Sequence, residues 1–577
     1  MIAASEDGIA YRPRLEGVDG GALKKLLEAS AQLFTQKDVR PLSLAALRRR
    51  AQGDVTRLET ALKSEAYYEG RVRFAIDTDE DPVGVTLQVE TGPSFPVRSF
   101  DVVIADDPVP DGAGEIPRNG RALAFAPGSP ATGTAILSAQ GRAIAVARRL
   151  GFAFVRVEDR RIAVDLRDKR VDVTVTLRLG ERVRFGPLEI TGLERVDRRF
   201  LEEYRPWEDG DLYDPDLVKT FAERLQGTGL FSSAQVRAAE EADDQGRLPI
   251  LVAVSERDRR TIGGGVEFAT NTGPGASLFW ENRNVGRRGQ KLRADLEVAQ
   301  IRQAGRLTYE QPRFLRFNQS LRLSLGGAID DTDAFRATTV TASAGVERVR
   351  TPRLTVGLGV EGEYARTEDA GLTTNSYLVA VPLSARWDST NDLLNPTKGQ
   401  RVSITIAPTA GVNDRFISFV KNDLRLSAYK ALGGTDRWVA AGRMRLASIV
   451  GESTDIIPSN RRLYAGGGGS VRPIEFQFAG PLDSDGGPAG GRSALEVGAE
   501  LRIKITDALG IAPFVEGGTV FDESVPSFNE TFLVGGGLGA YYLTPAGPFR
   551  LDVGVPFNGR PGIDDAFQIY LSLGQSF

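Results

Sequence analysis

The sequence predicts three small α+β domains followed by a 16-stranded antiparallel transmembrane β-barrel. Residues 1–258 mix helical and strand periodicities and repeat at about 80 to 90 residues, a spacing that suits a string of small domains. From about residue 261 the helical period disappears, and apolar residues alternate with polar or small ones. Such alternation is typical of strands with lipid on one side and a polar lumen on the other. We therefore expect domains at 1–93, 94–181 and 182–258, and a barrel at 259–577.

The third repeat has the clearest pattern of a small domain. Its first strand, at 183–190, ends at Gly192, and Asp214 and Pro215 then stand as the N-cap and first-turn proline of a helix. That helix has one buried face, because apolar residues follow at four-residue spacing: Leu217, Phe221 and Leu225. Two further strands complete the domain.

The first two repeats follow the same plan. The second has a helix at about 135–150 followed by Gly151 and Phe152, and its last strand ends at Gly180. The helix of the first repeat ends near Gly70, and its last strand also leads into a glycine. The order predicted for all three is β-α-α-β-β. The alternative is three α+β modules of no particular family.

The barrel prediction rests on strands whose two sides differ. In the segment 495–504, apolar residues at the odd positions alternate with polar or small ones, so both charge signs fall on the inner side. Sixteen such segments occupy the 319 residues after Asp258, and the even number returns the chain to its starting side. Alternate joins are short, such as 350–353, whereas one excursion runs from about 451 to 491. The alternative is a soluble β-sandwich or propeller.

The composition excludes several classes of function. With 26% charged residues and a formal net charge of -4, the chain lacks the basic surface of a nucleic-acid binder. It has no cysteine and no histidine, which removes Ser-His-Asp and Cys-His catalysis and the usual zinc ligands. We therefore expect no enzyme activity, no catalytic or metal site, no cofactor and no nucleic-acid partner.

The sequence shows neither the pattern of a membrane-spanning helix nor that of a signal peptide. No stretch approaches the roughly 20 apolar residues of a membrane-spanning helix. The N-terminus, Met-Ile-Ala-Ala-Ser-Glu, lacks a basic region followed by an apolar one, so we expect that a secretory signal peptide has been removed.

Several segments match the pattern of one known family. The stretch Gly229-Leu-Phe-Ser-Ser-Ala-Gln-Val236 fits POTRA domains, and Trp387-Asp-Ser-Thr-Asn-Asp-Leu-Leu-Asn-Pro-Thr-Lys-Gly399 is similar to a turn between two middle barrel strands. The stretch Ala465-Gly-Gly-Gly-Gly-Ser-Val-Arg472, with 478–481 and 490–493, is similar to an inward-folding loop. Together these segments resemble the BamA/TamA superfamily of outer-membrane assembly proteins. Three POTRA-like copies favour its TamA branch.

The resemblance implies a contact between this loop and the lumen. The loop motif of the family is Val-Arg-Gly-aromatic, and after Ser470 it reads Val471, Arg472, Pro473 and Ile474 here, so the glycine and the aromatic residue are missing and the arginine is kept. The family's arginine reaches an acidic residue on a later strand, for which Phe514-Val-Glu-Gly-Gly518 offers Glu516. A charge in a narrow lumen loses water and needs a partner, and a guanidinium-carboxylate contact fixes orientation as well as charge. The alternative is that Arg472 is a solvated loop arginine.

The barrel is expected to close weakly between its first and last strands. The glycines Gly263, Gly264 and Gly265 supply no side chains to pack across this lateral seam, and Leu573 and Gly574 are its expected residues on the last strand. The alternative is that the glycines permit the bend from the third domain into the barrel. The apolar side of the last strand is the expected C-terminal assembly signal: Phe567, Ile569, Leu571, Leu573 and Phe577.

By this resemblance we expect an outer-membrane translocation and assembly factor that inserts or secretes β-barrel or autotransporter-type proteins through the seam. The alternative is a two-partner-type secretion translocator or a passive outer-membrane channel. The implied partners are outer-membrane lipids, unfolded clients and an inner-membrane-anchored TamB-like protein that docks on the POTRA domains. The barrel would lie in the bacterial cell outer membrane, with the N-terminal domains in the periplasm.

Overall fold

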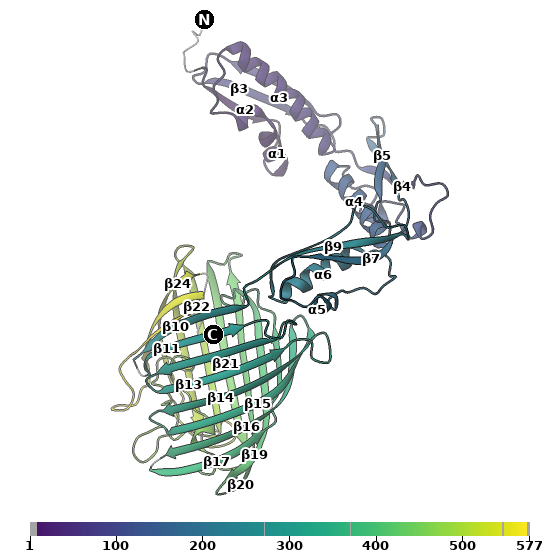
Figure 1. The fold of residues 1–577 in the computed structure, drawn as a ribbon. Coiled ribbons are helices and arrows are strands. Elements are labelled where there is room, and N and C mark those ends of the chain that lie inside the picture. Colours follow the sequence, from purple (N-terminus) through teal and green to yellow (C-terminus); the bar gives the residue numbers. More distant parts are fainter. Residues whose placement is uncertain (1–7, 271, 370, 545–546, 574–577) are drawn as a thin grey trace. The chain divides into compact units, whose positions relative to one another are not determined.

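The computed structural model describes residues 8–270, 272–369, 371–544 and 547–573 (Figure 1). The chain divides into two compact units. The first unit holds residues 1–193, 201–227 and 231–255. The second unit holds residues 194–200, 228–230 and 256–577.

The first unit contains three small sheets of three strands each. The strands are β1 (Tyr11–Glu16), β2 (Arg71–Asp77) and β3 (Val83–Glu90) in the first sheet, β4 (Val97–Ile104), β5 (Arg156–Asp165) and β6 (Arg170–Arg178) in the second, and β7 (Arg184–Thr191), β8 (Phe231–Ala238) and β9 (Arg247–Glu256) in the third. In every sheet the last strand lies in the middle and pairs in parallel with the first. Each sheet therefore has two edge strands.

The helices of the three domains differ in number. They are α1 (Ala22–Ser30), α2 (Gln32–Thr35) and α3 (Leu44–Ser64) in the first domain, α4 (Gly133–Arg149) in the second, and α5 (Arg198–Glu202) and α6 (Pro215–Gly227) in the third. The order β-α-α-β-β is therefore wrong for the first domain, which has a third helix. It is also wrong for the second, where the 3-10 turns η1 (Ala113–Glu115) and η2 (Arg121–Leu123) replace the first helix. The reason is that the segment 105–132 contains five prolines and four glycines, which disfavour a helix.

Helix α6 buries one side, with a small shift from the predicted residues. Phe221 and Leu225 are fully buried, whereas Leu217 is partly exposed and its neighbour Val218 takes the core position. The helix begins at Pro215, and Asp214 accepts a hydrogen bond from the backbone N–H of Asp216 at 2.8 Å. Across the described residues, no helix is long and apolar enough to span a membrane.

Two glycines occupy the same place in different domains. Gly17 follows β1 and Gly192 follows β7, and both have positive φ, at +83° and +85°. A side chain on Gly17 would collide with the carbonyl of Val89, and one on Gly192 with that of Val254, each on the neighbouring parallel strand. Only glycine adopts a positive φ easily and also leaves room for the neighbouring carbonyl. The repeat detected in the sequence is thus also a repeat of backbone geometry.

The second unit is a closed antiparallel barrel. Its strands are β10 (Arg260–Ala269), β11 (Gly273–Asn282), β12 (Lys291–Ala299), β13 (Arg302–Gln311), β14 (Gln319–Asp331), β15 (Arg336–Thr351), β16 (Leu354–Asp369), β17 (Leu372–Ala380), β18 (Leu383–Asp388), β19 (Lys398–Asn413), β20 (Arg415–Leu432), β21 (Trp438–Val450), β22 (Ser493–Lys504), β23 (Leu509–Phe521), β24 (Leu533–Thr544), β25 (Gly547–Pro556) and β26 (Gln568–Leu573). β17 and β18 both lie between β16 and β19, and they form one strand that Pro382 interrupts because it has no N–H for the ladder. The barrel therefore has sixteen strands, and the predicted fold class is confirmed.

The wall of the barrel has an apolar outside and a charged inside. Leu325, Val340 and Leu358 point outwards, and each is about half exposed, at 57%, 48% and 52%. On the inner side, Arg322 of β14 contacts Glu310 of β13 at 3.6 Å and Glu347 of β15 at 3.5 Å. These two sides follow from the period of two along each strand.

The long excursion between β21 and β22 folds back into the barrel. Its apolar side chains Leu463, Val471 and Ile474 are buried against the inner wall, where Phe419 and Val520 belong to the same cluster. At the base of the excursion, arginines make ion pairs with acidic residues of β16, namely Arg461 with Glu361 and Glu363, and Arg462 with Asp369. We call residues 451–492 the lumen loop.

Candidate functional site in the barrel lumen

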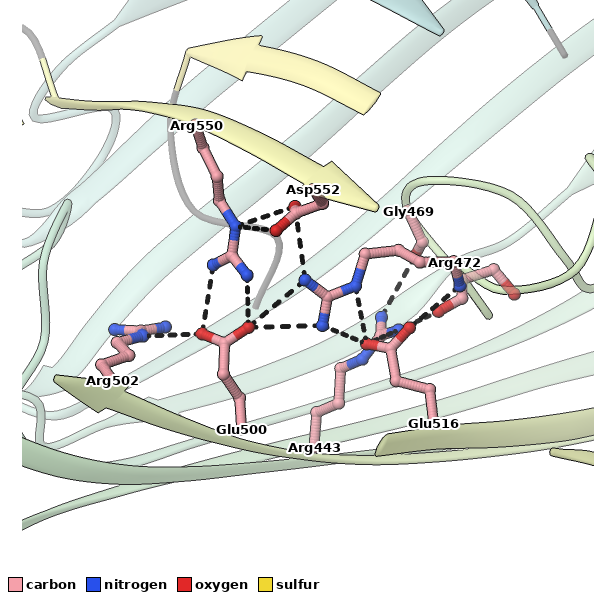
Figure 2. Close-up of polar contacts among 9 residues, drawn as sticks. Arg443, Gly469, Arg472, Glu500, Arg502, Glu516, Arg550 and Asp552 are labelled. Atoms are coloured by element: carbon pink, nitrogen blue, oxygen red, sulfur yellow. Dashed lines mark hydrogen bonds and ion pairs between the residues drawn. The ribbon is translucent and has the colours of Figure 1, made fainter. Parts of the chain in front are cut away.

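The tip of the lumen loop ends in a buried cluster of charged side chains (Figure 2). Arg472 of the loop is fully buried, and the carboxylates of Glu500 on β22, Glu516 on β23 and Asp552 on β25 face it. The remaining arginines of the cluster come from three wall strands: Arg443 of β21, Arg502 of β22 and Arg550 of β25. Residues two apart on a strand point to the same side, which places Glu500 with Arg502 and Arg550 with Asp552. We call these seven residues the lumen cluster.

Arg472 and Glu516 make three hydrogen bonds. The backbone N–H of Arg472 donates to Glu516 Oε2 at 2.9 Å. Its Nε and Nη2 donate to Glu516 Oε1 at 3.1 and 2.6 Å. The carboxylate therefore holds both the backbone and the guanidinium of the arginine, which fixes the loop tip in position and orientation.

The other side of the Arg472 guanidinium faces two more carboxylates. Nη1 lies 3.3 Å from Glu500 Oε2 and 3.3 Å from Asp552 Oδ2. The ring of Phe514 closes one face of the guanidinium, with its centroid 3.6 Å from Cζ. Arg472 is thus enclosed by carboxylates of three different strands.

The wall arginines balance these carboxylates. Arg550 donates from Nε to both oxygens of Asp552 at 2.8 Å and also pairs with Glu500. Arg502 donates to Glu500 at 3.0 Å. The cluster contains four guanidinium groups and three carboxylates, and this near balance offsets much of the cost of removing the charges from water.

Arg443 and Arg502 connect the cluster to backbone elsewhere. Arg443 donates to Glu516 at 2.9 Å and to the loop carbonyls of Gly469 and Ser470. Arg502 donates to the carbonyl of Pro396 at 3.3 Å, within the turn 387–399 that resembles a family motif. The loop tip and this turn therefore share one network of polar contacts.

Pro473 and Ile474 replace the glycine and aromatic residue of the family motif, and both are buried. Pro473 packs directly on Gly535 of β24 and on Gly554 of β25, where a side chain would collide with it. Ile474 belongs to the apolar cluster under the loop. Wall glycines thus make room for the bulkier proline at the loop tip.

The structure brings Arg472 and Glu516 together, and it adds five residues that sequence reasoning did not select: Arg443, Glu500, Arg502, Arg550 and Asp552. In the sequence these residues lie on the charged side of strands in which apolar and polar residues alternate. That pattern marks every inward position equally, so it could not single these residues out.

The predicted seam lies between β10 and β26. In the described part of the chain the two strands share two register pairs, Phe268 with Leu571 and Ala269 with Tyr570. The backbone N–H of Thr270 also donates to the carbonyl of Ile569 at 3.1 Å.

The predicted seam glycines precede Phe268 on β10, and their pairing across the seam stays a prediction because residues 574–577 lie outside the described residues. Gly263, Gly264 and Gly265 pair with β11 on their other side. Leu573 pairs with Phe549 of β25. Of the remaining seam and assembly-signal residues, Gly574 and Phe577 lie outside the described residues, Phe567 immediately precedes β26, and Ile569 and Leu571 lie within it.

The lumen loop also reaches the seam. A Cβ on Gly468 would lie 2.8 Å from the ring of Tyr570, so the glycine backbone and the tyrosine ring are in close contact. Tyr570 lies opposite Ala269 on one side and Asp552 of the lumen cluster on the other. The three paired residues Ala269, Tyr570 and Asp552 thus connect the seam to the lumen cluster.

No group of three or more Asp, Glu, His or Cys side chains in the described part of the chain is placed to hold a metal ion. The side chains and strand edges of the site offer ion pairing, backbone pairing and apolar contact.

Comparison with known proteins agrees with this architecture. The family model described as "Omp85 superfamily domain" matches residues 284–577, more than half of the chain. The chain belongs to the Omp85 superfamily. The match spans the barrel from the turn after β11 and includes the lumen loop and every residue of the lumen cluster.

Among Omp85-type relatives, the outer membrane protein assembly factor BamA of Nitratidesulfovibrio vulgaris is 24% identical over 451 residues. The alignment covers 74% of this chain and 55% of that protein, so the chain spans about half the length of the curated relative it matches. The crystal structure of BamA from Haemophilus ducreyi lacking POTRA domains 1–3 superposes with a TM-score of 0.70 at 16% identity, over 83% of this chain and 100% of that chain. CdiB from Escherichia coli gives a TM-score of 0.48 at 15% identity, over 92% and 98% of the two chains.

Proposed function

We propose that this Omp85 barrel is a bacterial outer-membrane assembly factor of the TamA type, which inserts β-barrel or autotransporter-type clients through the β10–β26 seam. The observation that carries the proposal is that β10 and β26, the first and last strands, close the barrel by backbone pairing without a turn between them, and that the lumen loop contacts this seam at Tyr570. A strand edge that opens there can accept a client strand by main-chain pairing, and the surrounding lipid receives the client as it folds.

The lumen loop supports assembly over passive conduction. The loop makes ion pairs with β16 through Arg461 and with β23 through Arg472, so it crosses the lumen between these strands. A passive channel needs an open lumen. The runner-up function, a two-partner-type secretion translocator or channel, requires the loop to leave this position.

The N-terminal domains provide edges for partners in the periplasm. Each of their sheets has two edge strands, and in the first domain these are β1 and β2. An added strand can pair with such an edge. We propose that the first domain binds an inner-membrane-anchored TamB-like protein, and that removing residues 1–92 abolishes capture of that partner.

Reconstitution tests the proposed function. The purified chain in liposomes is mixed with an unfolded autotransporter barrel, and the folded, protease-resistant client is measured over time. Insertion should be several-fold faster than into empty liposomes or liposomes that contain an unrelated barrel. Equal rates in all three, or a steady ion conductance through the purified protein in a planar bilayer, would contradict the proposal.

A further inference from the structure

The turns at one end of the barrel carry an unbalanced positive charge. β10 begins at this end, and the turns 283–290, 312–318 and 352–353 join successive strand pairs there. Together with the last residues of β15 they contain eight arginines and no carboxylate: Arg283, Arg287, Arg288, Arg313, Arg316, Arg348, Arg350 and Arg353. We call these segments the basic rim.

The other described turns at the same end have the opposite balance. They join β18 to β19, β20 to β21 and β22 to β23, and without their strand ends they contain Asp392, Asp436 and Asp507 against the single arginine Arg437. Counted in the same way, the turns of the basic rim contain six arginines and no carboxylate. The chain as a whole has a formal net charge of -4. The positive charge is thus a local property of the half of the rim that follows β10.

Three arginines of the basic rim are exposed and have no ion-pair partner among the described residues. Arg316, Arg350 and Arg353 have no carboxylate at salt-bridge distance among the residues that the structure describes. The charges of Arg316 and Arg350 also act unfavourably on Arg348. Like charges held together in this way favour an anion from outside the chain.

Exposed apolar side chains stand between these arginines. Leu315 is 82% exposed, Phe317 is 42% exposed and Val349 is 47% exposed. The guanidinium of Arg313 lies over the ring of Phe317, 5.1 Å from its centroid. A surface that alternates arginine with apolar side chains suits the boundary of a bilayer, where the apolar groups enter the acyl region and the charges remain at the headgroups.

We propose that the basic rim binds the phosphates of anionic phospholipids in the leaflet that it meets. The inference rests on the proposed function only in placing the barrel in a membrane. A guanidinium donates two hydrogen bonds to a phosphate, and an anionic leaflet attracts basic residues within a Debye length of about 10 Å at 0.1 M salt. The exposed Leu315 and Phe317 beside the arginines favour lipid over an acidic protein segment, which would leave these side chains in water.

Direct lipid binding tests the proposal. Fluorescent phosphatidylglycerol and phosphatidylethanolamine are titrated against the purified full chain in a neutral detergent, and binding is measured by anisotropy. The protein should prefer phosphatidylglycerol by about fivefold or more, and the triple variant Arg316→Gln, Arg350→Gln, Arg353→Gln should lose that preference. A matched triple variant at the other end of the barrel, Arg336→Gln, Arg366→Gln, Arg415→Gln, should keep it.

The assay separates this proposal from the proposed function because no client is present. Equal binding of the two lipids, or a preference that survives in the first triple variant, would overturn the basic rim as a lipid site. If that variant does not fold, as judged by the heat-dependent gel shift of a folded barrel, the salt dependence of lipid binding by the wild-type protein tests the proposal instead. Its preference should fall when salt is raised from about 0.1 to about 1 M, which shortens the Debye length to about 3 Å, and a preference unchanged by salt would refute the proposal.

Discussion

Arg472 is the residue through which the loop and the wall of the barrel depend on each other. Its guanidinium is completely buried, so its charge is stable only while the carboxylates around it stay in place. The dependence is mutual, because Glu516 takes hydrogen bonds from both Arg472 and Arg443 and is itself buried. Removing either side chain takes two hydrogen bonds from the buried charge of the other.

The first prediction is a strong coupling between these two residues. Arg472→Met and Glu516→Gln should each lower the free energy of unfolding of the barrel by about 3 to 5 kcal/mol. The double variant should lose less than the sum, because the Arg472–Glu516 contact is lost only once when both residues are replaced. Urea unfolding in lipid vesicles, followed by tryptophan fluorescence, measures all three.

The control for this cycle is an arginine on the same inner wall that remains in water. The side chain of Arg425 is 64% exposed and pairs with Asp423. Arg425→Met should therefore cost no more than about 1 kcal/mol. Strict additivity of the Arg472 and Glu516 effects would show that their contact contributes nothing of its own.

Only part of this site could be predicted from the sequence. Arg472 and Glu516 stand in short motifs that resemble known ones, whereas Glu500 and Asp552 are two of many inward charges on alternating strands. Their selection depends on where the lumen loop descends. The packing of Pro473 on Gly535 and Gly554 depends on the same path, and no pattern in the sequence describes it.

At the scale of elements, the sequence predicted strands more accurately than helices in the N-terminal domains. Strands are specified by a period of two and by glycines such as Gly192. The missing first helix of the second domain reflects local chemistry, since the prolines of 105–132 remove N–H donors and restrict φ. The third helix of the first domain, α2, has four residues, too few to produce a periodic signal.

The backbone segment 194–196 is held by a single carboxylate. Glu256, at the end of β9, accepts hydrogen bonds at 2.9 Å from the backbone N–H groups of Glu194, Arg195 and Val196. The next residue of that segment, Asp197, donates from its backbone N–H to the carbonyl of Arg287 in the turn after β11. Glu256 thus organises a backbone segment that contacts the barrel within the second unit.

The second prediction is that this contact depends on pH. Partial burial alone would raise the pKa of Glu256, but the three backbone donors outweigh it and hold the pKa below the usual glutamate value. A lowered pKa means that the stabilisation is complete above the unfolded pKa, about 4.3, and disappears as pH falls through the lower folded pKa.

Hydrogen exchange compares wild type with Glu256→Gln at each pH, so that the intrinsic effect of pH on exchange cancels. The amides of residues 194–196 should be better protected in the wild-type chain at neutral pH, because a charged acceptor binds them more strongly than an amide oxygen. The difference should vanish in acid, once the carboxyl is protonated. Equal protection at neutral pH would refute the role assigned to Glu256.

At the scale of the whole molecule, the fold could be predicted because its evidence is repeated. A single amphipathic segment is a weak signal, but sixteen of them in series leave few alternatives to a barrel. In the same way, the regular spacing of the N-terminal repeats indicates a string of small domains. The seam is different. Which residues of β10 and β26 stand opposite each other depends on the register of the closed barrel, for which the structure describes the pairs Phe268 with Leu571 and Ala269 with Tyr570.

The last prediction uses that register to test whether the seam opens. Phe268 and Leu571 are register partners across the seam, and cross-strand partners stand at a distance that a disulfide can bridge. Because the chain has no cysteine, Phe268→Cys with Leu571→Cys introduces the only pair. Oxidation should reduce client insertion in the liposome assay at least tenfold, and reduction should restore it, since a closed seam offers no strand edge to the client.

A matched pair within the wall controls for the disulfide itself. Leu551 lies opposite Leu571 on the other side of β26, where no opening is expected. Leu551→Cys with Leu571→Cys should therefore leave insertion nearly unchanged when oxidised. If both disulfides block insertion equally, the barrel needs general flexibility and the seam has no special part. If neither disulfide blocks insertion, clients enter the membrane without lateral opening of the β10–β26 seam.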